Sequence, residues 1–178
     1  MNKNRKSSFE EELKKVREEK LDSRELRALD YLFPKVLRYV MYKMRTEKEV
    51  LKKFEEEFEK QESPRVQEEI FKYLKENDFI NDKRYTKLFL KESMNFKRNS
   101  IFELKMKLKQ KGIDSEYIED AALDLEDELN TFEYNLIMQI IKERQRRNQD
   151  EQKIKAYLYR KGFNGGNIKN AFLDYEEN

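Results

Sequence analysis

Apolar residues recur three or four positions apart through most of the chain, with charged residues between them. This spacing places the apolar side chains on one face of a helix, so it predicts a series of amphipathic helices. One such pattern occurs twice, at residues 104–126 and again at residues 154–176. A pattern of this length that returns along the chain predicts a helical unit that is used more than once.

Each copy of the pattern places a glycine where its first helix should end. Gly112 and Gly162 each follow a lysine and precede an apolar residue, Ile113 or Phe163. Glycine readily adopts the left-handed backbone that closes many helices, and the apolar residue after it packs back on the last turn. Asp114 can then cap the next helix. Each copy is therefore predicted to be a helix, a glycine stop and a second helix.

Signals for helix starts divide the rest of the chain into groups of three helices. Pro34 suits the first turn of a helix, where its missing N–H costs nothing. Thr46 and Glu49 have the spacing of a capping box. Ser63 followed by Pro64 predicts the start of another helix. The side chains expected to face inward include Val36, Val40, Met41, Leu74, Tyr85, Leu88, Leu104, Ile118, Leu136, Ile154 and Ile168.

We therefore predict an all-α fold of tandem three-helix repeats that form an elongated, curved helical array. The repeats are expected at residues 34–80, 81–129 and 130–178, and Thr131 is expected to open the first helix of the last repeat. Residues 1–33 are predicted to form a charged, partly helical N-terminal arm.

Composition supports a helical protein and excludes several kinds of chemistry. The chain has no cysteine and no histidine, and it has only two prolines and four glycines. Disulfides, thiol catalysis and imidazole acid–base chemistry are therefore excluded, and a turn-rich β fold is disfavoured. We expect no catalytic residue, no cofactor and no metal site, so the protein is not expected to be an enzyme. Without a long apolar run or a signal peptide, a cytoplasmic protein is expected. A monomer is expected because no unit shows a surplus apolar stripe.

Charge is nearly balanced overall but is segregated along the chain. The net charge is +2, from 39 basic and 37 acidic residues. Residues 97–111 and 142–161 are strongly basic, whereas residues 114–133 carry acids and no basic residue. The acidic block could face a basic partner, bind a divalent cation or remain solvated. The basic blocks could neutralise phosphates, or they could be solvated helix faces. The candidate contacts are Lys97, Arg98, Lys105, Lys109, Lys111, Arg144, Arg146, Arg147, Lys155, Arg160 and Lys161.

Several segments together resemble the RecX family over about residues 37–173. They are LRYVMYKMRTEKEV at residues 37–50, NDFINDKRYTKLFLKE at residues 77–92, and the glycine stops LKQKGI and LYRKGF. One departure is Asp78, which stands where glycine is usual before an apolar pair. The resemblance implies tandem three-helix repeats and no catalytic motif.

The resemblance also implies a partner and a role. A RecX-like chain is expected to lie in the groove of the RecA filament on single-stranded DNA and to modulate RecA, most often by inhibition. ATP hydrolysis, strand exchange and co-protease activity would be hindered. The residues alone leave two alternatives open, a stand-alone helical DNA-binding protein and a helical scaffold for another protein.

Overall fold

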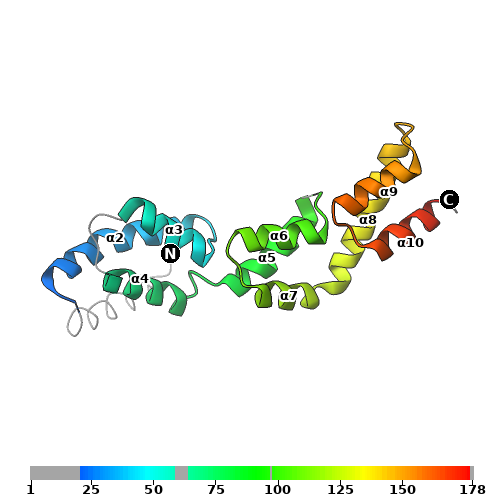
Figure 1. The fold of residues 1–178 in the computed structure, drawn as a ribbon. Helices are drawn as coiled ribbons and strands as arrows, with labels where there is room; N and C mark the ends of the chain where they lie inside the picture. Colours follow the sequence, from blue (N-terminus) through cyan, green and yellow to red (C-terminus); the bar gives the residue numbers. More distant parts are fainter. Residues whose placement is uncertain (1–20, 59–63, 97, 177–178) are drawn as a thin grey trace. The chain divides into compact units, whose positions relative to one another are not determined.

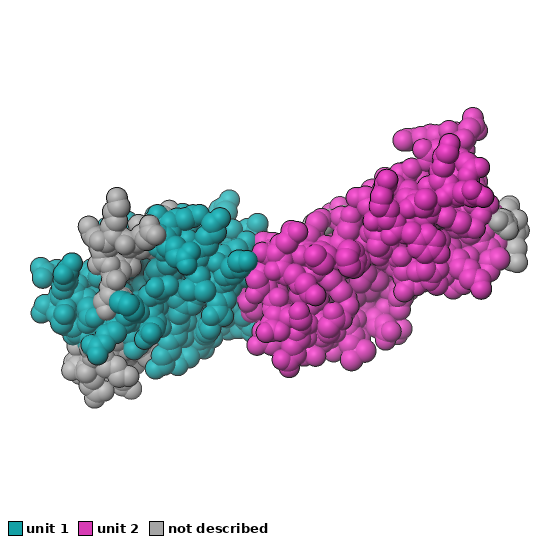
Figure 2. Space-filling view, viewed as in Figure 1, with its two compact units in different colours: residues 1–81 teal, residues 82–178 magenta. Residues whose placement is uncertain are grey.

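The computed structural model describes residues 21–58, 64–96 and 98–176, and these residues form helices with no strand among them (Figure 1). The chain divides into two compact units, residues 1–81 and residues 82–178 (Figure 2). The prediction of an all-α fold of three-helix groups is confirmed. None of the described helices is long and apolar enough to cross a membrane. Most of the predicted arm, residues 1–20, lies outside the described residues.

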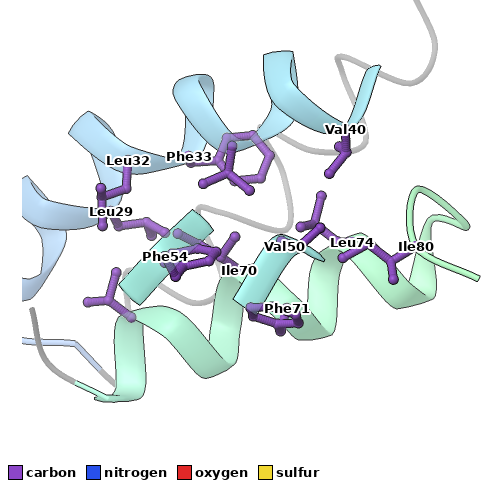
Figure 3. Close-up of a cluster of buried hydrophobic side chains, with 12 residues drawn as sticks. Leu29, Leu32, Phe33, Val40, Val50, Phe54, Ile70, Phe71, Leu74 and Ile80 are labelled. Carbon is purple, nitrogen blue, oxygen red and sulfur yellow. The ribbon is translucent and has the colours of Figure 1, made fainter. Parts of the chain in front are cut away.

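Unit 1 contains the helices α2 (Ser23–Tyr42), α3 (Glu47–Phe58) and α4 (Pro64–Glu76). Pro64 begins α4 as predicted. The capping box at the start of α3 is also confirmed, because Thr46 N donates to Glu49 Oε2 at 3.0 Å and Glu49 N donates to Thr46 Oγ1 at 3.2 Å. Figure 3 shows the side chains that α2, α3 and α4 bury against one another. Leu32, Val50, Val66 and Leu74 are fully buried there.

The prediction that Pro34 begins a helix is wrong. Helix α2 begins earlier, behind Asp22, whose Oδ1 accepts hydrogen bonds from the backbone N–H groups of Arg24 and Glu25 at 2.7 and 2.8 Å. The helix then runs through Pro34 without ending. An interior proline costs about 3 kcal/mol, and the apolar side chains that α2 buries on both sides of it, such as Leu29 and Val40, offset that cost.

Unit 2 contains two further groups of three helices. The first is α5 (Asp82–Phe96), α6 (Ile101–Gln110) and α7 (Ser115–Asp124), and the second is α8 (Glu126–Gln145), α9 (Glu151–Arg160) and α10 (Gly165–Glu176). Helix α8 begins at Glu126, so the expected start at Thr131 is wrong. Buried Leu129 already belongs to the inward face of α8. Acidic residues in the first turn favour this start, because they lie at the positive end of the helix dipole.

Both glycine stops are present as predicted. Gly112 and Gly162 have φ angles of 83° and 75°, in the left-handed region. The backbone N–H of Ile113 donates to Leu108 O, and that of Phe163 donates to Leu158 O, both at 3.2 Å. These are the bonds of a Schellman ending. Unit 1 ends α4 in a similar way with Asp78 (φ 59°), after which Phe79 N donates to Leu74 O at 2.8 Å.

Two side chains expected to face inward do not do so. Met41 is 49% exposed and Leu88 is 40% exposed. In α5 the buried positions are instead Tyr85, Thr86, Leu90 and Ser93. Apolar residues outside the periodic stripe are common on protein surfaces, and a local pattern cannot identify whether Leu88 or Leu90, two positions apart, turns inward.

Candidate basic interaction surface

A buried carboxylate joins the two helix groups of unit 2 and thereby positions their basic residues. Glu133 of α8 is only 1% exposed. Its Oε1 accepts a hydrogen bond from Ile101 N at 2.9 Å, at the start of α6. Its Oε2 accepts from Asn164 N at 3.0 Å and from Asn167 Nδ2 at 3.2 Å, at the start of α10. A negative charge is favoured at the N-termini of both helices.

Further contacts surround this joint. Ser100 Oγ donates to Lys161 O at 2.7 Å, and Lys161 Nζ forms an ion pair with Glu103 at 3.0 Å. Partial burial acts to raise the pKa of Glu103, but hydrogen bonds from Asn99 and Lys161 outweigh it and lower that pKa. The start of α6 is therefore tied to the turn between α9 and α10, residues that are far apart in sequence.

Several of the predicted cations form ion pairs within the protein. Lys105 pairs with Glu119 at 2.5 Å and Lys161 pairs with Glu103 at 3.0 Å. Lys155 pairs with Glu151 one helical turn before it. Exposed pairs of this kind contribute about 0–1 kcal/mol to stability, so a strong external anion could compete for them. These paired lysines are nevertheless less available to bind an external anion than unpaired cations are.

Three predicted arginines do come together around one polar hollow. Arg98 precedes α6, Arg144 is in the last turn of α8, and Arg147 lies in the turn after α8. With Ile140, Glu143, Gln149 and Tyr157, they line a hollow of about 560 Å³. We call this the arginine hollow. Non-local folding creates it, because Arg98 comes from one helix group and the other residues come from the next.

Contacts inside the arginine hollow hold its side chains in place. The guanidinium carbon of Arg144 lies 3.6 Å from the centroid of the Tyr157 ring, and Arg144 Nη1 donates to Gln149 Oε1 at 2.7 Å. Arg98 Nη2 donates to Glu143 Oε2 at 2.8 Å, and this bond is the main cause of the lowered pKa of Glu143. Glu143 therefore remains ionised at neutral pH and holds Arg98 in an ion pair.

The other candidates lie outside the arginine hollow. Arg146 and Lys109 are exposed. Arg160 lies near the same tyrosine, 5.9 Å from the Tyr157 centroid, but it does not line the hollow. Lys111 lies 5.6 Å from the Tyr85 ring. Lys97 falls outside the described residues, as do any contacts it makes. Sequence reasoning included the three arginines but missed Glu133, Glu143 and the amide of Gln149.

The acidic block provides no cluster suited to a metal ion. Among the residues that the structure describes, no group of three or more Asp or Glu side chains is arranged to hold one. Lys83 and Lys87 of α5 instead pair with Asp120 and Asp124 of α7, at 3.4 and 3.0 Å. Part of the block therefore joins α7 to α5.

Comparisons with known proteins agree with this architecture. Residues 81–121, which span α5, α6 and most of α7, match the family model described as RecX, second three-helix domain. The regulatory protein RecX of Caldanaerobacter subterraneus subsp. tengcongensis is 32% identical over 99 residues, which cover 54% of this chain and 48% of the relative. That of Finegoldia magna is 30% identical over 132 residues, covering 71% and 63%. The chain spans about half or less of the first curated relatives that it matches.

Solved structures show the same similarity. The crystal structure of RecX from Lactobacillus salivarius matches with a TM-score of 0.69 and 26% identity, covering 84% of this chain and 97% of that one. A second crystal structure, of a regulatory protein RecX, matches with a TM-score of 0.67 and 25% identity, covering 84% and 78%.

Proposed function

Since this chain belongs to the RecX family, we propose that it regulates the RecA recombinase by binding the RecA filament on single-stranded DNA. Inhibition of the filament's ATPase, strand exchange and co-protease activities is the expected effect. The protein acts by binding, without a catalytic step of its own. The family resemblance supplies the partner, and the arginine hollow supplies the kind of surface that such a polyanionic partner needs.

The arginine hollow is the observation that carries the proposed contact. Arginine presents a planar set of donors that matches phosphate and carboxylate oxygens in a bidentate manner. Three arginines face one space of about 560 Å³, and only one carboxylate, Glu143, lines the same space. Because Arg144 is held over Tyr157, less side-chain freedom is lost when it binds an anion. The hollow is therefore suited to a phosphate of the DNA or a carboxylate of RecA.

The test is a titration of the DNA-dependent ATPase of RecA on poly(dT) with the full chain. The double variant Arg144→Gln/Arg147→Gln is expected to need roughly tenfold more protein for half-maximal inhibition, which corresponds to about 1.4 kcal/mol. The control, Lys153→Gln/Lys169→Gln, removes two exposed lysines of unit 2 that do not line the hollow. It is expected to inhibit like the unaltered chain. If the unaltered chain neither binds the filament nor changes the ATPase at low salt, the proposed function is wrong.

Glu143→Gln is expected to strengthen filament binding by a few-fold. The lowered pKa of Glu143 keeps its carboxylate charged at neutral pH, where it holds Arg98. The amide would release the charge of Arg98 for an external anion while keeping the side-chain volume. The measurement is filament co-sedimentation at several salt concentrations. Equal or weaker binding by the variant would show that Arg98 does not contribute to the contact.

A further inference from the structure

The solvent face of α2 carries a basic and aromatic pattern that the arginine hollow does not explain. Two basic residues followed by a tyrosine occur twice along this helix with the same spacing. The second set repeats the first at a step of 11 residues, from 24 to 35, from 27 to 38 and from 31 to 42. The six side chains are Arg24, Arg27 and Tyr31, followed by Lys35, Arg38 and Tyr42.

Helical geometry gathers these six side chains into one narrow stripe. At 3.6 residues per turn, a step of 11 residues returns to almost the same side of a helix, and the six positions fall within about 80° of the circumference. All six side chains are exposed, and Tyr31 and Tyr42 are 60% and 87% exposed. The buried residues of α2, such as Phe33 and Val40, lie on the opposite side. We call these six residues the α2 stripe.

The α2 stripe is free of acidic residues. Within the described part of the chain, none of its four cations forms an ion pair with a carboxylate. Arg27 Nε donates to Ser23 O at 3.1 Å, along its own helix. Lys35 Nζ lies over the Tyr31 ring, 3.6 Å from its centroid. The nearby Asp22 accepts the hydrogen bonds of the helix cap. Backbone hydrogen bonds from Glu25 and Arg24 lower its pKa, with a smaller contribution from the charge of Arg24.

A surface that combines exposed tyrosines with cations that have no carboxylate partner is suited to a single-stranded nucleic acid. Cations neutralise the phosphates, and each aromatic ring offers a face on which a base can stack, worth about 1–3 kcal/mol per base. The rise of 1.5 Å per residue places Tyr31 and Tyr42 about 16 Å apart along the helix. A single strand lying along α2 could therefore stack one base on Tyr31 and another on Tyr42. The phosphates between these two bases would then lie against Lys35 and Arg38.

Two other partners fit the α2 stripe less well. A helix that lies on a membrane buries its apolar face in the lipid, but the apolar face of α2 is already packed against α3 and α4 (Figure 3). Duplex DNA keeps its bases stacked on one another, which leaves the two tyrosines without a base to contact. Single-stranded nucleic acid uses both the charges and the rings.

We propose that the α2 stripe is a binding site for single-stranded nucleic acid on unit 1. Its four cations contact phosphates, and Tyr31 and Tyr42 stack with bases. This binding needs neither RecA nor the arginine hollow, so it extends beyond the proposed function and does not rest on it. The stripe is recognisable only because α2 is continuous through Pro34, whereas a helix beginning at Pro34 would separate its two halves.

The test measures binding of the full chain alone to a fluorescein-labelled 20-nucleotide oligo(dT) by fluorescence anisotropy at several salt concentrations. Tyr31→Ala/Tyr42→Ala is expected to weaken binding at least tenfold, whereas Tyr31→Phe/Tyr42→Phe keeps the rings and stays within about twofold. Lys35→Gln/Arg38→Gln is expected to reduce the slope of log affinity against log salt by about 1.4, or about 0.7 per lost phosphate contact.

The matched control is Lys52→Gln/Lys72→Gln, which removes two exposed lysines of α3 and α4 in the same unit. It is expected to bind like the unaltered chain. The proposal is overturned if this control weakens binding as much as Lys35→Gln/Arg38→Gln does, or if the alanine variant retains full affinity. It is also overturned if the chain binds duplex DNA equally well, or if vesicles of anionic phospholipid bind it in place of the oligonucleotide. The RecA titration does not decide this proposal, because that titration uses variants of unit 2, whereas the α2 stripe belongs to unit 1.

Discussion

Replacement of Glu133 by alanine is expected to lower the free energy of unfolding of unit 2 by about 3–5 kcal/mol. The buried carboxylate accepts hydrogen bonds from Ile101 N, Asn164 N and Asn167 Nδ2. Alanine would leave these donors, all of them in partly buried hydrogen bonds, without an acceptor, and an unsatisfied donor shielded from water costs about 1–3 kcal/mol. The variant would also contain a cavity beneath the starts of α6 and α10. The measurement is urea unfolding combined with amide hydrogen exchange.

Hydrogen exchange separates a specific effect at this joint from general destabilisation. The amides of Ile101 and Asn164 should exchange much faster in Glu133→Ala, because they lose their acceptor. Glu133→Gln keeps one acceptor oxygen and is expected to have an intermediate stability. The control is Glu92→Ala, which removes an exposed carboxylate from α5 and should change stability by no more than about 0.5 kcal/mol. If Glu133→Ala is as stable as this control, Glu133 does not hold the two helix groups together.

Features that depend on neighbouring residues could be predicted from the sequence. The left-handed turns at Gly112 and Gly162 follow from a glycine placed after an apolar helical pair. The caps at Thr46, Asp114 and Asp150 follow from a side-chain oxygen placed before a helical pattern. All of these hydrogen bonds span at most five residues, so the local pattern contains the needed information.

Features that depend on distant residues could not be predicted in this way. Glu133 is one acid in a block of acids, and its sequence neighbourhood suggests a solvated side chain. Its burial arises because α8 packs under the starts of α6 and α10, which lie 31–34 residues away in the sequence. The continuation of α2 through Pro34 has a related cause, since side chains contributed by α3 and α4 offset the cost of the proline.

The candidate site also combines features that the local sequence indicates with features that depend on distant residues. Basic blocks in the sequence indicated Arg98, Arg144 and Arg147 among other cations, but not that these three would share a hollow. Nor did they indicate that Lys105 and Lys161 would pair with acids. Ion pairing is decided by which faces the folded helices turn toward each other, and a count of charges along the chain does not contain that information.

Gly162→Ala is expected to destabilise unit 2 by about 2–5 kcal/mol for two separable reasons. An alanine at a φ of 75° adopts left-handed backbone, which costs about 1–2 kcal/mol for a residue with a Cβ. The added Cβ would also lie 2.7 Å from Cδ1 of Phe102, a contact that forces one of the two to move. Overpacking of this kind typically costs a further 1–3 kcal/mol.

A double-mutant cycle with Phe102→Ala separates these two costs. In the Phe102→Ala background the contacts with Cδ1 and Cγ are removed, and only a contact with the retained Cβ at 3.0 Å remains. Gly162→Ala is therefore expected to cost little more than the roughly 1–2 kcal/mol of the left-handed backbone. The coupling energy, obtained from urea unfolding of the four proteins, would then measure how tightly α6 rests on the turn between α9 and α10. A coupling energy near zero would show that Phe102 moves aside without cost. The joint would then depend on Glu133 and the polar contacts around it rather than on close packing.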